Sequence, residues 1–259
     1  MLGWMIGAGS SPRRSSVRTA TCQRVGAALR RLVAPCCAVC RVERGDPVCP
    51  GCLRDFMDPD CLRCVVCGAG LAAFALRASA DEPAEAPRCG RCQAAAPAFD
   101  RTVVLGDYAP PLDGMVMALK AGGRLDLARV FADLLARRIA GGAAIDCLLA
   151  VPLADRRQRE RGFNQSLEIA RVLARRLAVP LRRGALVRLR AGPPQQSLPL
   201  RERRGNVRGA FGLRHPVPVR SAAVVDDVMT SGATLDEVAR VLKRGGVQQV
   251  VNLVVARTP

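Results

Sequence analysis

The sequence is poor in aromatic residues, in histidine and in long hydrophobic runs. Aromatic residues make up 3% of the 259 positions, so stacking platforms for single-stranded nucleic acid are not evident. No segment reaches the roughly 18 uncharged apolar residues of a membrane-spanning helix. We therefore expect a soluble protein without a membrane span. The single histidine, His215, precedes Pro216 in a basic segment and is interpreted as a polar loop residue.

Positive charge, in contrast, is abundant. Lysine and arginine together number 40 against 22 acidic residues, which gives a net charge of +18, and Lys120 and Lys243 are the only lysines. Arginine suits bidentate contact with phosphate. A basic chain of this kind favours polyanionic partners, either nucleic acid or phosphorylated metabolites. A GC-rich genome would explain the ratio of arginine to lysine, although not the excess of positive charge.

The spacing of the cysteines indicates metal binding. Ten of the twelve cysteines lie between Cys36 and Cys92, and eight of these form Cys-x2-Cys pairs. Two such pairs complete a tetrahedral four-thiolate zinc site. The simplest pairing predicts one zinc held by Cys37, Cys40, Cys49 and Cys52 and a second held by Cys64, Cys67, Cys89 and Cys92. Cys36 and Cys61 leave another register open, because Cys61 and Cys64 also have the required spacing.

Composition also predicts where the chain divides. No basic segment precedes the apolar residues 1–9, which makes a poor secretion signal, so we expect a cytoplasmic protein with reduced cysteines. The predicted parts are a tail with a short helix (1–29), a module that resembles a double zinc ribbon (30–97) and an α/β domain (98–259). Zinc would act mainly as a folding staple, worth about 10–16 kcal/mol in such sites. Nucleic-acid or partner binding by this module is an additional hypothesis.

After Phe99, apolar runs alternate with helical patterns. Strands are predicted at 101–107, 145–151, 222–228 and 248–256, and helices at 112–120, 124–140, 165–178 and 234–245. Strands that alternate with helices indicate a mostly parallel sheet flanked by helices. In such sheets ligands bind outside the carboxyl ends of the strands.

One strand end carries the chemistry of an anion site. The buried strand 222–228 brings Asp226 and Asp227 to its end, and a helix begins near Leu235. The turn between them consists of Thr230, Ser231, Gly232, Ala233 and Thr234. Unpaired N–H groups at the helix N-terminus and the hydroxyls of this turn would cradle a phosphate, and the carboxylates would accept hydrogen bonds from sugar hydroxyls. The alternative is a capped turn in which Asp and Thr are purely structural; four preceding apolar residues and the adjacent Asp pair make it the weaker interpretation.

This segment resembles the signature of the type I phosphoribosyltransferases, an apolar strand followed by two acidic residues and a Thr/Gly-rich loop. In that family the loop binds the 5-phosphate of phosphoribosyl diphosphate, and the acidic pair holds the 2- and 3-hydroxyls of the ribose. The resemblance implies these roles for residues 230–234 and for Asp226 and Asp227. It also implies the type I phosphoribosyltransferase fold, with magnesium bound together with the substrate.

Further segments are similar to the ComF-type, competence-associated phosphoribosyltransferases, over about residues 30–257. They are Ala150-Val151-Pro152-Leu153, the string from Asp155 to Gln165, Pro194-Gln195 and the segment from Arg201 to Phe211. The resemblance implies a protein that binds phosphoribosyl diphosphate with magnesium and transfers the phosphoribosyl group to an unknown acceptor, in the context of DNA uptake. The alternative is a non-catalytic, ligand-regulated accessory protein that binds single-stranded DNA during transformation. Competence helicase or processing proteins are expected partners.

The arginines that follow the second predicted strand are suited to bind the diphosphate leaving group. Arg156 and Arg157 would lie near the diphosphate, where developing negative charge needs neutralisation. Asn164 is a plausible helix N-cap, and segment 190–208 is predicted to be a flap over the site. The further residues expected around the diphosphate and in the flap are Pro152, Leu153, Arg161, Asn164, Gln165, Gln195, Arg204 and Asn206. A solvated basic surface is the alternative for any one of these arginines.

Overall fold

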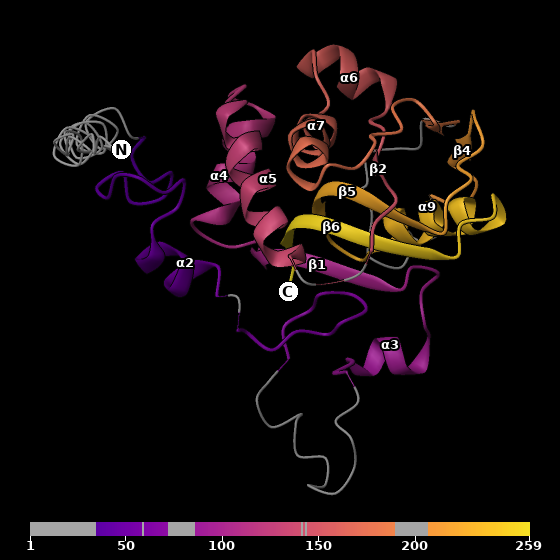
Figure 1. Ribbon diagram of the computed structural model, residues 1–259, viewed down its shortest axis with the longest axis horizontal. Helices are drawn as coiled ribbons and strands as arrows, with labels where there is room; N and C mark the ends of the chain where they lie inside the picture. The colour runs from indigo at the N-terminus through magenta and orange to yellow at the C-terminus, as the bar shows by residue number, and fades with distance from the viewer. Residues whose placement is uncertain (1–34, 59, 72–85, 141, 143, 190–206) are drawn as a thin grey trace, which may run out of the picture. The chain divides into compact units, whose positions relative to one another are not determined.

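The computed structural model describes residues 35–58, 60–71, 86–140, 142, 144–189 and 207–259 (Figure 1). The chain forms two compact units, one that ends at Cys49 and one that runs from Pro50 to Pro259. The tail with its short helix, predicted at 1–29, lies outside the described residues. So do three predicted site residues of the flap, Gln195, Arg204 and Asn206.

The described part of the first unit is a tight cysteine knuckle. Cys36 and Arg44 form an isolated antiparallel bridge. The N–H of Cys37 donates to the carbonyl of Glu43 at 2.7 Å. The sulfur of Cys37 accepts the N–H groups of Val39 and Cys49 at 3.4 and 3.3 Å. Such N–H donors favour a thiolate, the form that binds metal.

The second unit is built on a four-stranded parallel sheet. Its strands are β1 (Arg101–Asp107), β2 (Cys147–Ala150), β5 (Ser221–Met229) and β6 (Gln249–Arg257), in the order β1-β6-β5-β2. β5 and β6 are buried almost throughout, as expected for strands covered on both faces. All four predicted strands and their parallel pairing are confirmed.

Helices cover both faces of this sheet. α4 (Leu112–Lys120), α5 (Asp126–Ile139) and α7 (Gln165–Leu177) contact the strands, and Figure 1 shows these three helices on the same side of the sheet. α9 (Ala233–Arg244) contacts β6 and β4 (Phe211–Leu213), and β4 pairs antiparallel with β3 (Leu186–Arg188). The predicted helices agree with these to within two residues. The sheet flanked by helices is therefore the predicted fold class.

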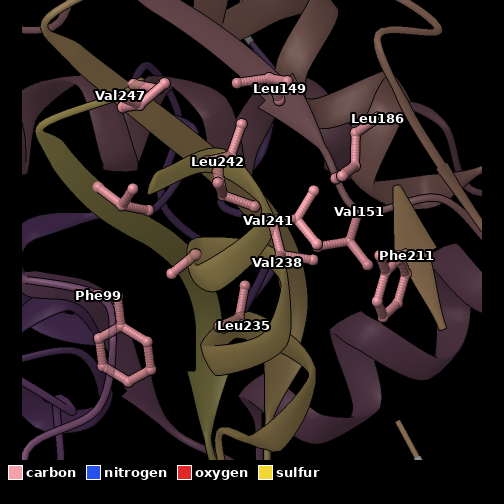
Figure 2. Packing of buried hydrophobic residues seen from close by; sticks show 14 of the residues in the cluster. Phe99, Leu149, Val151, Leu186, Phe211, Leu235, Val238, Val241, Leu242 and Val247 are labelled. Atoms are coloured by element: carbon pink, nitrogen blue, oxygen red, sulfur yellow. The ribbon is translucent and has the colours of Figure 1, made fainter. Parts of the chain in front are cut away.

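The core on the α9 side is shown in Figure 2. Val238, Val241 and Leu242 of α9 pack with strand residues such as Leu149 and with Phe211 of β4. α9 is amphipathic, and its apolar side chains recur every three to four residues, so one stripe of the helix is buried. This packing fixes the direction in which the helix N-terminus points.

The second cysteine segment belongs to the same unit as the sheet. Cys64, Cys67 and Cys92 share a hydrophobic cluster with Phe99 and Val104. The N–H of Thr102 in β1 donates to the carbonyl of Val65 at 3.0 Å. Composition predicts a domain boundary between residues 97 and 98. This boundary remains a prediction, and the contacts just described cross it.

Three short helices were not predicted from the sequence. They are α2 (Pro50–Phe56), α3 (Gly90–Ala94) and α6 (Asp155–Arg161). α6 contains no apolar residue and buries none, so hydrophobic periodicity cannot reveal it. Gly162 ends α6 in the left-handed conformation at φ 74°. Within the described residues, no helix combines the length and the apolar character that crossing a membrane requires.

Candidate functional site

A cavity of about 570 Å³ opens at the carboxyl ends of the parallel strands. Its wall includes Tyr108 after β1, Pro152 and Leu153 after β2, and Thr258 after β6, together with residues 226–235 at the end of β5. This is the place that the topology of an open parallel sheet gives to a ligand. The volume lies in the range of small-molecule sites. The cavity therefore brings together most of the predicted site residues that the structure describes.

Two carboxylates from the end of β5 lie at the base of this cavity. Oδ2 of Asp227 lies 3.1 Å from the ammonium nitrogen of Lys120 and accepts Nε2 of Gln165 at 2.6 Å. Oδ1 of Asp226 accepts the hydroxyl of Ser166 at 3.1 Å and the N–H of Asp227 at 2.9 Å. Each carboxylate is thus held by α7, and Asp227 also by the last residue of α4.

Burial changes the acidity of Asp226. Removal from water raises the pKa of Asp226 to about 7, and the negative charge of Asp227 adds to the rise. The N–H of Asp227, the charge of Lys120 and the hydroxyl of Ser166 act in the opposite direction. The charge of the site consequently changes around neutral pH, which is a common property of functional carboxylates.

The loop between β5 and α9 has the geometry of an anion cradle. Gly232 stands just before the first turn of α9 with φ 81°, a conformation that favours glycine. A Cβ on Gly232 would also lie 2.6 Å from Cε of Met229. Thr230, Ser231 and Thr234 line the cavity beside it. The N-terminus of a twelve-residue helix thus faces the cavity, as the sequence predicts.

Arginines occupy the wall formed by α6 and β3. Arg157 and Arg161, one helical turn apart, are half-buried and line the cavity. Arg156 also reaches the cavity rim, but its guanidinium is largely exposed and pairs with Glu160 at 2.7 Å. Arg188 lies over the ring of Phe211, with 5.3 Å between its guanidinium carbon and the ring centroid. Burial and the neighbouring charge of Arg157 lower the pKa of Arg188, so this wall favours an anion.

The start of α7 contains one structural and one site-facing residue. Asn164 is the helix N-cap, as predicted: its Oδ1 accepts the N–H of Leu167 at 3.3 Å. Its Nδ2 donates to the carbonyl of Val151 at 3.0 Å, so Asn164 holds the loop after β2 instead of facing the cavity. Gln165 does line the cavity. Its Oε1 is buried and has no hydrogen-bond partner within the described part of the chain.

The cysteines form the two predicted groups. The sulfur atoms of Cys37, Cys40, Cys49 and Cys52 all lie within 4.8 Å of one another, and so do those of Cys64, Cys67, Cys89 and Cys92. Burial works against ionisation of Cys37 and Cys64, yet N–H donors lower their pKa values to about 6 and about 7. These donor sets fit zinc, which prefers four thiolates in structural sites. Cys36 and Cys61 are exposed and lie outside both groups.

Comparison with known proteins now gives the family. No protein-family model matches the chain. The chain is 39% identical over 176 residues to the DNA utilization protein YhgH of Escherichia coli K12, with 66% of this chain and 78% of that protein covered. It is 32% identical over 174 residues to Competence protein F of Haemophilus influenzae, with 64% and 76% covered. The chain belongs to the ComF family.

In this ComF-family chain, the structure adds site residues that the sequence reasoning did not assign. They are Tyr108, Lys120, Ser166, Arg188 and Thr258. Lys120 carried a signal, since it is one of two lysines in an arginine-rich chain. Tyr108 is the single tyrosine of the chain. Ser166, Arg188 and Thr258 are ordinary in sequence, and only the folding of distant segments brings them to the site.

Proposed function

We propose that this cavity binds phosphoribosyl diphosphate together with magnesium and that the protein transfers the phosphoribosyl group to a nitrogen acceptor. One observation carries the proposal: a helix N-terminus, a pair of carboxylates and a wall of arginines surround a single cavity at the carboxyl edge of the sheet. A phosphorylated sugar with a second anionic group presents the complementary chemistry. Membership of the ComF family and the resemblance to type I phosphoribosyltransferases support the same ligand.

Each part of the ligand has a matching part of the wall. The 5-phosphate would accept N–H groups and hydroxyls of the loop 230–234. Asp226 and Asp227 would accept hydrogen bonds from the ribose hydroxyls. The diphosphate would face Arg157 and Arg161, with Arg156 at the rim.

The residues that line the cavity offer the type of ligand atom that magnesium binds. The carboxylates of Asp226 and Asp227 and the orphan Oε1 of Gln165 are oxygen ligands, which is the donor type that magnesium prefers. Magnesium, when bound with the diphosphate, neutralises negative charge on the leaving group.

The proposed reaction is a displacement at the anomeric carbon. The bond from this carbon to the diphosphate oxygen breaks, and the electron pair stays on that oxygen. The bond to the acceptor nitrogen forms, and the nitrogen releases its proton. Arg157 and Arg161 would stabilise the charge that develops on the diphosphate, while the carboxylates favour the positive charge that develops on the ribose ring.

Isothermal titration with phosphoribosyl diphosphate and magnesium tests the site. We expect the wild type to bind and Asp226→Ala and Asp227→Ala to bind at least about tenfold more weakly, as for loss of hydrogen bonds to charged groups. Asp126→Ala, which removes an exposed carboxylate paired with Arg124, is the control and should bind as the wild type does. No binding by the wild type, or equal binding by all four proteins, would refute the site.

A second candidate function rests on the relatives. Two of them are named for DNA utilization and competence, and the net charge of +18 suits a polyanion. We infer a role in DNA uptake, in which the chain binds single-stranded DNA and phosphoribosyl diphosphate regulates that binding. Fluorescence anisotropy with single-stranded DNA should give an affinity that falls steeply with salt. Affinity that is absent at low salt, or independent of salt, would rule this function out.

A further inference from the structure

Arg257 connects the second four-cysteine group to the end of β5. It is the last residue of β6 and is 5% exposed. Its Nε donates to the carbonyl of Cys67 at 3.2 Å, and its Nη1 donates to the carbonyl of Met229 at 3.2 Å and to that of Thr258. One planar guanidinium therefore bridges the cysteine knuckle and the residue that precedes the phosphate loop 230–234.

Met229 in turn controls the start of that loop. Its carbonyl accepts the N–H of Thr258 at 2.9 Å as well as the guanidinium. Its side chain lies so close to Gly232 that a Cβ there would be 2.6 Å from its Cε. A shift of Met229 would consequently push its side chain against Gly232 and displace the loop.

On this side the loop borders open space as well as packed side chains. A second cavity, of about 180 Å³, lies between the cysteine group and the loop, with Cys67 and Cys92 on one wall and Ser231, Gly232 and Ala233 on the other. Solvent-sized space thus lies on both sides of the loop, since the same three residues line the large cavity. Where packing is incomplete, directional hydrogen bonds decide the position of the backbone.

We propose that Arg257 is a positioning residue for the phosphate loop, and that through it the second four-cysteine site must be metal-loaded for the loop to bind phosphate. This inference rests on the proposed phosphate site. A metal ion at Cys64, Cys67, Cys89 and Cys92 fixes the carbonyl of Cys67; the guanidinium transmits that position to Met229. Loss of the metal releases the carbonyl and loosens the loop.

Arg257→Gln tests the connection, with Arg138→Gln as the matched control. Arg138 also donates to three main-chain carbonyls, those of Met57, Val104 and Leu105, at 2.7–3.0 Å, and none of these three residues belongs to the second cysteine group or to the loop. We expect Arg257→Gln to weaken binding of phosphoribosyl diphosphate about tenfold or more, with zinc content unchanged. Arg138→Gln should lower the unfolding temperature without this loss of affinity. Equal losses in both variants, or none in Arg257→Gln, would overturn the connection.

Hydrogen exchange separates this inference from the proposed function. In folded, zinc-loaded protein without ligand, Arg257→Gln should speed exchange of the amides in 230–235 about tenfold, and zinc withdrawal from the wild type should do the same. If the wild type binds no phosphoribosyl diphosphate yet these amides respond, the function fails and the connection stands. Unchanged exchange in Arg257→Gln would overturn the connection whatever the ligand.

Discussion

The ammonium nitrogen of Lys120 lies 3.1 Å from Oδ2 of Asp227, and the two side chains are 15% and 9% exposed. The last residue of α4 thereby forms a mostly buried ion pair with the carboxyl end of β5. Asp226, next to this pair, is the carboxylate whose pKa is raised to about 7. The positive charge of the lysine favours the ionised form of Asp226 and so opposes this rise.

Lys120→Met should disturb both carboxylates. It leaves Asp227 without its cation, and removal of one partner from a buried pair typically costs about 3–5 kcal/mol; water in the cavity should reduce this. Because the charge of Lys120 opposes the rise in the pKa of Asp226, its loss should move the pH midpoint of ligand binding above about 7. Titration calorimetry across pH measures this. Lys120→Arg, which keeps the charge, should leave the midpoint nearly unchanged, and an equal shift in both variants would contradict the electrostatic explanation.

The pKa of Asp226 predicts opposite pH dependences for stability and binding. Between about pH 4 and about pH 7 the folded state binds more protons than the unfolded state, so the free energy of unfolding of the ligand-free protein should fall as pH rises. Affinity for phosphoribosyl diphosphate should rise over the upper part of this range, because the ionised carboxylate is the better acceptor. Urea unfolding and calorimetry measure the two slopes. Asp226→Asn should remove this residue's part of both, and unchanged slopes would show that another group is responsible.

Gly232→Ala should abolish phosphate binding and destabilise the protein. The left-handed backbone costs an alanine about 1–2 kcal/mol, and the new Cβ meets Met229 at 2.6 Å. Gly184→Ala is the matched control, since Gly184 has φ 71° but open space around a Cβ. Thermal unfolding measures the loss of stability, and binding of inorganic phosphate measures the loss of the site. Gly184→Ala should lower the unfolding temperature but leave phosphate binding unchanged. Normal phosphate binding by Gly232→Ala would argue against the loop as the cradle.

Arg157→Ala should weaken binding of diphosphate more than binding of ribose 5-phosphate. Arg157 is half-buried on the cavity wall, whereas Arg159 is exposed on α6 and provides the control. Loss of a charged hydrogen bond corresponds to about tenfold or more in affinity. Competition binding with the two anions measures the difference. A similar loss for Arg159→Ala would indicate a general effect of positive charge.

Removal of zinc should unfold the cysteine segments. Structural zinc sites of this kind contribute on the order of 10–16 kcal/mol to folding, more than the small knuckles could supply from their own cores. Cys64→Ser should lower the zinc content and the unfolding temperature. Cys61→Ser, which alters an exposed cysteine outside both groups, should do neither. Zinc content is measured by atomic emission, and retention of full zinc by Cys64→Ser would disprove the assigned ligand set.

Local chemistry explains what could be predicted. Two residues separate the cysteines of each pair, so a single knuckle turn brings their sulfurs together, and the predicted groups are those observed. The strand, the Asp pair and the loop 230–234 are continuous in sequence, and Gly232 takes the positive φ that such a turn requires. α6 was missed because a helix of charged residues has no apolar period.

Other contacts of the site join segments that are distant in sequence, so only the folded structure reveals them. Lys120, Gln165 and Asp227 come from α4, α7 and β5, and the side chain of Asn164 donates to the carbonyl of Val151. The link from Cys67 through Arg257 to Met229 joins residues up to 190 positions apart. The sequence by itself predicted the turn 230–234 that follows the Asp pair and the Cys-x2-Cys pairs of the two cysteine groups, because each of these lies within a short continuous segment. The tertiary structure decided which side chains share the cavity and what supports the loop, because those contacts depend on the register of the sheet and the packing of helices across it.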